Sequence, residues 1–330
     1  MRNKGLASAC ASALPPQASA LDTMTIKFPI ILIHGWTDKP AETGTWKVVE
    51  RSLTKASIHF YVPSISRFGS IEERSQRLIE EMSGLYPVGQ PVHLIGHSMG
   101  GIVARDIAAR ENLPFRILSA TTLGSPNRGL RYLDKIPMLD GASEDAAKIR
   151  ELFGTDFGGL TNLSCKFMSE FNRKTRNNPK VRYFSWAGLL VLPTLSYAPH
   201  ALIVYPFYPK SDGIVGVDTA MWDSDLGPGT HLGTVAGLTH SSIVSLETFE
   251  KTLPHLAATE LGVTLPVQPI SSSLRTQLTR RVIGHKDAIQ GRLLAIKDSK
   301  HICDEKHKAA GYVFNALDGY MCTKARQDSK

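Results

Sequence analysis

The sequence predicts an α/β fold in which a mostly parallel sheet is flanked by helices. Short apolar runs typical of buried strands alternate with helical stretches at the spacing of βα units. A Gly-x-Ser-x-Gly pattern at 96–100 stands between one such strand and one such helix. The chain has 330 residues, of which 42% are hydrophobic and 21% charged, so it is long enough to bury a sizeable core.

The expected strands and helices follow one another from residue 28 onward. Buried strands are predicted, in order, at 28–35, 58–65, 92–96, 115–126 and 181–188. Helices are predicted between the early strands, at 44–56, 71–85 and 100–111. The charged residues among 72–77 are expected on the outer face of their helix. The fold is expected to close with a strand within 231–240 and a helix at about 241–253.

These elements divide the chain into three parts. Residues 1–23 form a leader, 24–264 the main domain and 265–330 a C-terminal tail of unknown role. The tail holds 12 Lys and Arg against six Asp and Glu, a net charge of +6 out of +8 for the whole chain. A basic tail can favour acidic membranes, but a solvated tail is the simpler interpretation. No nucleic-acid partner is expected, and the sequence does not indicate an oligomeric state.

The leader is compatible with three compartments. It is cationic at its start, and Ala18-Ser19-Ala20 resembles a signal-peptidase site. Its apolar middle is short and is interrupted by Pro15-Pro16. A signal peptide, a transit peptide and a disordered leader therefore stay open, and so do a secreted, a mitochondrial and a cytoplasmic location.

An insertion is expected at about 127–210. From Tyr183 to Pro209 the chain has no Asp, Glu, Lys or Arg. Four prolines within this stretch break any continuous helix, so we expect no transmembrane span. We interpret the apolar segment 186–208 as a lid or a surface for an acyl chain, with a buried core segment as the alternative.

The four cysteines of the chain and the histidines of its tail do not predict a metal or cofactor site. Cys10, Cys165, Cys303 and Cys322 are scattered, which is unlike a disulfide framework, although Cys303 and Cys322 could pair in an oxidising compartment. The stretch 301–307 reads His-x-Cys-x₃-His and lacks a known metal-ligand spacing. We therefore expect neither a metal nor a cofactor.

The segment 91–105, PVHLIGHSMGGIVAR, predicts a nucleophile elbow at Ser98. An apolar strand leads into the Gly-x-Ser-x-Gly pattern and a helix of small and apolar residues leads out of it, as an elbow requires. Glycines at 96 and 100 allow the strand and the helix to pass closely. The bare pattern is weak, and its context makes it specific. The alternative is a Gly-rich turn without chemistry.

A nucleophilic serine needs a histidine as base, and His240 is the best candidate. In hydrolases built on such a sheet the acid and the base follow the serine in the chain. His34 precedes Ser98, and His97 is expected to point away from the nucleophile. His240 follows the apolar run 234–236 and precedes a helix. The other downstream histidines are His200, His231 and His255, of which His231 would fall at the wrong end of its strand.

The carboxylate that orients the base is expected at Asp212. It stands on a glycine turn in Ser211-Asp212-Gly213, between apolar segments. Asp218, Asp223 and Asp225 are competitors, with surface charge as the simpler interpretation of each. Two backbone N–H groups are expected to bind the oxyanion. They are those of Met99, directly after the serine, and of Trp36, after the strand at 28–35.

Motifs spread over about two thirds of the chain resemble the triacylglycerol lipase family of eukaryotes, especially fungi, which is related to bacterial true lipases. The matching pieces run in order from Phe28 to Ser245: FPIILIHGW, FGSIEERSQRL, VHLIGHSMGGIVAR, TTLGSPNRG, FMSEFN…VRYFSWAG and SDGIVGVDTAMW…LGTVAG. The resemblance implies an α/β-hydrolase fold, an ester substrate at a lipid–water interface and a triad of Ser98, Asp212 and His240.

The chain departs from this family around its histidine. Such lipases commonly have Asp before the histidine and Leu-Asp after it, whereas this chain reads Leu238-Thr239-His240-Ser241-Ser242. The acids that help bacterial relatives hold a structural calcium ion are missing, which argues against calcium here.

Three functions stay open at this point. The first is a lipase or esterase that acts on acylglycerols or other long-chain esters through an acyl-enzyme. The second uses the same triad as an acyltransferase, a phospholipase or a thioesterase. The third is a non-catalytic lipase-like binding protein, against which the intact set of triad residues argues.

Overall fold

A computed structural model describes residues 26–36, 44–135, 158–191, 204–267, 312–315 and 321–324. Within these ranges six parallel strands form one sheet in the order β2-β1-β3-β4-β5-β6. Their bounds are β1 Ile30–Ile33, β2 Phe60–Tyr61, β3 Pro91–His97, β4 Arg116–Leu123, β5 Arg182–Leu189 and β6 Thr230–Ala236. A separate antiparallel pair consists of β7 (Tyr312–Asn315) and β8 (Met321–Lys324).

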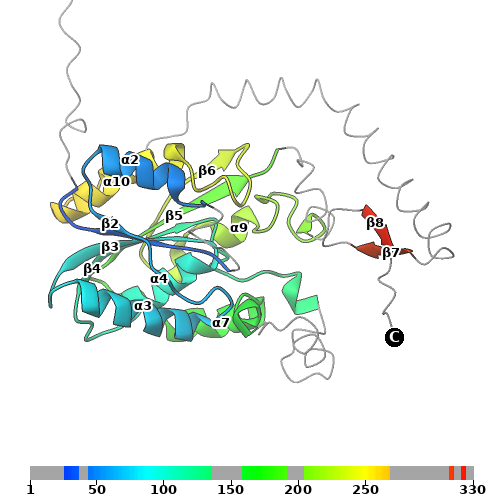
Figure 1. Ribbon diagram of the computed structural model, residues 1–330, viewed down its shortest axis with the longest axis horizontal. Coiled ribbons are helices and arrows are strands. Elements are labelled where there is room, and N and C mark those ends of the chain that lie inside the picture. Colours follow the sequence, from blue (N-terminus) through cyan, green and yellow to red (C-terminus); the bar gives the residue numbers. More distant parts are fainter. Residues whose placement is uncertain are drawn as a thin grey trace, which may run out of the picture.

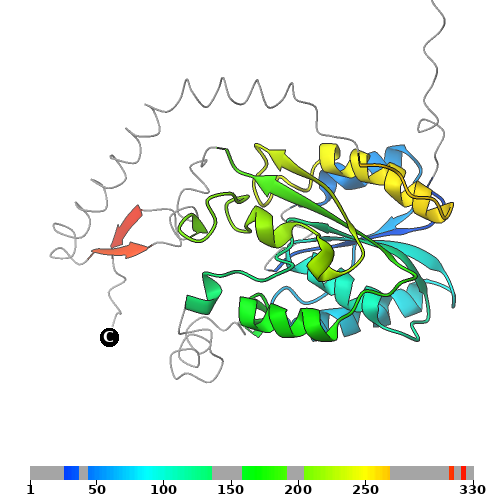
Figure 2. The same ribbon diagram turned by 180° about the vertical axis from the view of Figure 1, so that it is seen from behind.

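Helices cover both faces of the parallel sheet (Figures 1 and 2). One face carries α2 (Lys47–Lys55) and α10 (Leu246–Glu260), and the other carries α3 (Ile71–Leu85), α4 (Met99–Ala109) and α7 (Cys165–Lys174). The short elements are α6 Gly158–Thr161, α9 Val217–Ala220 and the 3₁₀ turns Leu133–Lys135 and Ser224–Leu226. The six strands of the sheet and helices α2, α3, α4 and α10 follow one another in the order that the sequence predicted.

Strand β1 shows why its sequence is uniformly apolar. Ile31 and Ile33 pack into the cluster under α3 and α4, whereas Ile30 and Leu32 pack into the cluster under α2 and α10. All four side chains are fully buried. Successive side chains of a strand point to opposite faces, so a parallel strand covered on both sides needs a continuous apolar run rather than an alternating one.

Helix α3 has the predicted bounds, but one of its charges is not on the outer face. Ser70 and Glu73 form a reciprocal capping box that starts the helix at Ile71. Arg74 is fully buried, contrary to the expectation for 72–77. It lies three residues after Ile71 and four before Leu78, both buried, and this helical spacing places it on the apolar face.

Two elements differ in extent from their predictions. Strand β2 covers two residues instead of 58–65, because it is an edge strand that pairs with β1 alone. Helix α10 begins after the cap Ser245 and continues through Pro254, beyond the predicted end near 253. Proline has no N–H, so Pro254 leaves the carbonyl of Glu250, four positions earlier, without its helical hydrogen bond. Glu250 is exposed, so water can donate to that carbonyl instead.

The uncharged segment contains part of the main sheet. Strand β5 pairs with both β4 and β6, so residues 182–189 are core rather than insertion, and Trp186 is buried. The expected insertion at about 127–210 is therefore divided by a strand of the sheet. Residues 192–203 lie outside the described residues, and the lid stays a prediction, as do the domain boundaries. In the described part of the chain, no helix is long and apolar enough to cross a membrane.

Candidate active site

Ser98 stands on a strained turn between β3 and α4. Its backbone has φ 53° and ψ −127°, a region that a residue with a side chain rarely adopts. A Cβ atom added at Gly96 would lie 2.2 Å from the carbonyl oxygen of Gly100, and one added at Gly100 would lie 2.3 Å from that of Ile33. Only glycine permits this close approach of strand and helix. The local sequence thereby forces the serine to the carboxyl end of the sheet.

His240 connects Ser98 to Asp212. Its Nδ1 lies 2.8 Å from Asp212 Oδ2, and its Nε2 lies 2.9 Å from Ser98 Oγ. A carboxylate can only accept, so Nδ1 carries the proton, and in the neutral ring Nε2 accepts from the serine hydroxyl. The three residues come from three different sheet connections and are all buried. This arrangement leaves a base lone pair directed at the serine.

The turn around Asp212 fixes its carboxylate. Oδ1 accepts hydrogen bonds from the backbone N–H groups of Ile214 and Val215, at 2.9 and 2.7 Å, which leaves Oδ2 for the histidine. The backbone carbonyl of Asp212 also accepts from the N–H of His240 at 2.8 Å. The acid and the base are therefore connected both by their side chains and by their backbones.

The alternative candidates for the acid and the base have other contacts, are exposed or lie outside the described residues. Asp218 pairs with Arg131 at 2.6 Å, Asp223 pairs with Arg128, and Asp225 is exposed. His231 contacts the hydroxyls of Ser185 and Thr234, and burial lowers its pKa to about 4. His255 packs against Phe184, and His200 lies outside the described residues.

A buried arginine holds the loop that precedes Trp36. The guanidinium of Arg74 donates to the backbone carbonyls of both His34 and Gly35, the latter at 3.2 Å. The same loop passes close to Ser98, since a Cβ atom added at Gly35 would lie 3.1 Å from the Cβ of Ser98. In a trans peptide the C=O and N–H groups point in opposite directions. A fixed Gly35 carbonyl therefore also fixes the direction of the Trp36 N–H.

His97 contacts His240. Its Nε2 donates to the backbone carbonyl of His240 at 2.7 Å, and the two imidazole rings lie 4.8 Å apart. Sequence reasoning missed this contact because the partner is a backbone atom 143 positions away. Arg74 was missed as well, although its spacing from Ile71 and Leu78 was a signal that could have identified it.

Apolar and aromatic side chains surround the elbow. Met99 is fully buried at the start of α4, and Trp36, Leu160 and Ile214 pack as partly buried side chains against the cluster that contains it. Tyr132 donates from its hydroxyl to the carbonyl of Ile214 at 3.2 Å. Burial and, to a smaller extent, the carboxylate of Asp212 raise the pKa of Tyr132, so its hydroxyl stays protonated.

The described residues contain no group of three side chains arranged to hold a metal ion.

Residues 30–251 match the model of a family described as the alpha/beta hydrolase family. The chain is 27% identical to triacylglycerol lipase 2 of Saccharomyces cerevisiae over 219 residues, and this match covers 62% of this chain and 63% of the yeast protein. It is 33% identical over 198 residues to a triacylglycerol lipase of Burkholderia plantarii, covering 57% of this chain and 51% of that protein. The match therefore spans between half and two thirds of these relatives.

Solved structures share the arrangement of strands and helices. The lipase of Staphylococcus hyicus superposes with a TM-score of 0.56 at 18% identity, over 71% of this chain and 96% of that one. The mature form of the Bacillus licheniformis lipase BlEst2 superposes with a TM-score of 0.54 at 21% identity, over 70% and 92%. At such identities the likeness concerns the fold.

Proposed function

This chain belongs to the alpha/beta hydrolase family and has its fold, and from that premise we propose that it is a serine ester hydrolase that acts as a lipase on long-chain carboxylic esters. The observation that carries the proposal is the imidazole of His240 between Ser98 Oγ and the Asp212 carboxylate. The curated relatives named triacylglycerol lipase support the substrate class. We extend the assignment to the fungal-type lipases on the motifs that run from Phe28 to Ser245.

In the proposed reaction Ser98 Oγ attacks the ester carbonyl while its proton moves to His240 Nε2. The tetrahedral oxyanion is bound by the N–H groups of Met99 and Trp36, each of which contributes about 2.7–4 kcal/mol in comparable sites. His240 then gives the proton to the leaving alcohol, and an acyl-enzyme remains on Ser98. Water repeats the sequence with the same base and releases the carboxylate. Asp212 keeps the imidazole oriented and stabilises its charged form.

The first experiment measures hydrolysis by the wild-type chain and by Ser98→Ala. The substrates are p-nitrophenyl esters from acetate to palmitate and an emulsified triglyceride. We expect kcat to fall by at least about three orders of magnitude in Ser98→Ala, with unchanged thermal unfolding. A fluorophosphonate probe should label the wild type but not the variant. Ester hydrolysis that survives in Ser98→Ala would refute the proposal, and faster transfer to an added alcohol than to water would replace hydrolase with acyltransferase.

The second experiment tests the acyl-chain surface. Leu190 follows β5, and its N–H donates to the carbonyl of Ser211, directly before Asp212. Replacing Leu190 and Leu192 by Ser should depress hydrolysis of long-chain esters about tenfold or more relative to acetate, because each lost apolar contact is worth about 1.5–3 kcal/mol. The control is Leu261→Ser, at an exposed position beyond α10. An equal loss on short and long esters would reduce the assignment to an esterase.

A further inference from the structure

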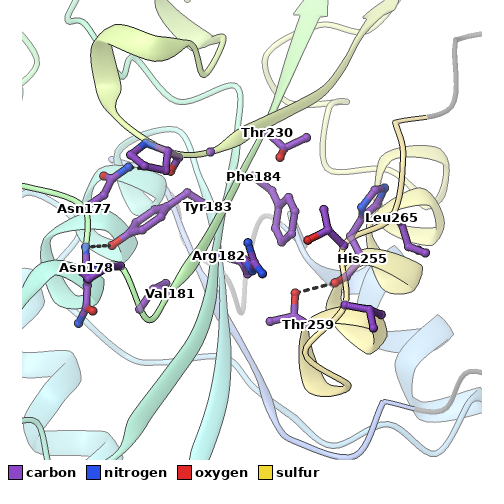
Figure 3. A pocket seen from close by; sticks show the side chains of 15 residues that line it. Asn177, Asn178, Val181, Arg182, Tyr183, Phe184, Thr230, His255, Thr259 and Leu265 are labelled. Carbon is purple, nitrogen blue, oxygen red and sulfur yellow. Dashed lines mark hydrogen bonds between the residues drawn. The ribbon is translucent and has the colours of Figure 1, made fainter.

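A cavity lies at the opposite end of the sheet from Ser98. Figure 3 shows it at the first residues of β5 and β6, against the C-terminal half of α10. Its volume is about 210 Å³. Phe184 in its wall pairs with Thr230, the first residue of β6. Ser98 follows the last residue of β3, whereas this cavity opens at the amino ends of the strands, so the two sites share no side chain.

Arg182 is the one cation among the described residues that line this cavity. These described residues include no Asp, Glu or Lys, so Arg182 carries the only formal charge among them at neutral pH. Arg182 and Phe184 are two positions apart on β5, so both point to the face covered by α10. Arg182 is exposed, and within the described residues its guanidinium makes no hydrogen bond or ion pair. A free guanidinium in a concave wall without acids favours an anion.

The rest of the wall is apolar or neutral. The rings of Phe184 and His255 lie 5.5 Å apart, and burial lowers the pKa of His255, so its imidazole is uncharged at neutral pH. Thr259 lies one helical turn after His255 and donates from its hydroxyl to the carbonyl of that residue at 2.7 Å. Leu265 adds an aliphatic side chain at the end of the cavity (Figure 3).

We propose that this cavity binds a small carboxylate with a short apolar chain. The planar fork of Arg182 matches the two oxygens of a carboxylate, and the surface of Phe184, His255 and Leu265 suits a short hydrocarbon. One cation balances one negative charge, whereas a phosphate monoester carries about −1.5 to −2. The cavity is also smaller than the roughly 300–1,000 Å³ typical of sites for drug-sized ligands. The inference does not depend on the hydrolase assignment.

The test is a titration of the full chain with sodium hexanoate, followed by NMR. We expect saturable shifts of the His255 imidazole and of the Val263 methyl groups, which line the cavity. Signals of His240 report separately on any binding at Ser98. Arg182→Gln should weaken the response at His255 at least tenfold, and Arg182→Lys should weaken it less. The matched control is Arg116→Gln, because Arg116 is exposed at the start of the neighbouring strand β4 and does not line the cavity.

Three results would overturn the proposal. The first is the absence of saturable shifts at His255 in the wild type. The second is an equal loss in Arg116→Gln and Arg182→Gln, which would indicate general charge attraction. The third is equally strong binding of 1-hexanol, which has the same chain without the carboxylate. Thermal unfolding of each variant shows whether the fold is retained, and Arg182→Lys keeps the proposal testable if Arg182→Gln unfolds.

Discussion

The imidazole of His97 donates a hydrogen bond from Nε2 to the backbone carbonyl oxygen of His240, with 2.7 Å between the two atoms. The residue directly before the proposed nucleophile thus holds the loop that carries the proposed base. A carbonyl oxygen only accepts, so the Nε2 of His97 must keep its proton for this contact. His97 is a positioning residue in this arrangement, because it acts through the backbone of His240.

Replacing His97 by Phe should lower kcat about tenfold to a hundredfold and leave KM nearly unchanged. The buried carbonyl of His240 then loses its donor, which typically costs about 1–3 kcal/mol. His97→Gln keeps an N–H donor of similar reach and should recover much of the rate. The measurement is the kinetics of both variants on one soluble ester. A rate in His97→Phe equal to that of the wild type would contradict the positioning role.

Asp212→Asn should reduce kcat by about 10²–10⁴, because the amide can hold the imidazole in the wrong tautomer. Asp218→Asn and Asp223→Asn break surface ion pairs with Arg131 and Arg128 instead, and each should cost less than about threefold. The comparison requires only steady-state kinetics on one ester. A larger loss at Asp218 than at Asp212 would show that the acid had been assigned to the wrong residue.

Arg74→Met should lower kcat about 10- to 1,000-fold with a small change in KM. The loop before Trp36 would lose the donors that hold its carbonyls, and one misplaced oxyanion donor costs up to about 2.7–4 kcal/mol in the transition state. The control is Arg77→Met, which removes an arginine that pairs with Glu80 and Glu81 on the exposed side of the same helix. A parallel rise in KM, or an equal loss in the control, would count against this role.

Ser98→Gly should be more stable than Ser98→Ala, although neither has a nucleophile. Position 98 has φ 53° and ψ −127°, and such a conformation costs a residue with a side chain about 1–3 kcal/mol. Glycine avoids this strain but loses about 0.5–1 kcal/mol of chain entropy relative to alanine. Urea unfolding should therefore favour the glycine variant by about 1 kcal/mol. Equal or reversed stabilities would mean that the elbow is not strained.

Local patterns predicted the parts of the molecule that local chemistry decides. The apolar run of β1 and the glycines around Ser98 lie within a few residues of the structures they determine. Strand β2 is shorter than predicted because it lies at the edge of the sheet and pairs with β1 alone. The spacing of Arg74 from Ile71 and Leu78 could have marked it as buried, but the distant backbone carbonyls that Arg74 and His97 contact are set by chain packing and leave no local signal.

The buried pair of Glu260 and His93 makes stability depend on pH at the end of α10. Glu260 accepts from His93 Nε2 at 3.2 Å and from the backbone N–H groups of Lys27 and Phe28 at 3.1 Å. Burial raises the pKa of Glu260, but these hydrogen bonds outweigh it, so the pKa lies below its usual value of 4.5.

A carboxyl group whose pKa is lower in the folded state stabilises the fold above its unfolded pKa and loses that effect as the pH falls through the folded pKa. Glu260→Gln should therefore cost about 1–2 kcal/mol of unfolding free energy at pH 7, in line with hydrogen bonds to charged groups. The difference in unfolding free energy between Glu260→Gln and the wild type should shrink below pH 4.5, because the wild-type carboxylate becomes protonated. Glu247→Gln, which breaks an exposed pair with Lys251, should cost less than about 0.5 kcal/mol at any pH. Urea unfolding between pH 3 and 7 measures both variants, and a gap at Glu260 that stays constant over this range would show that its charge does not stabilise the fold.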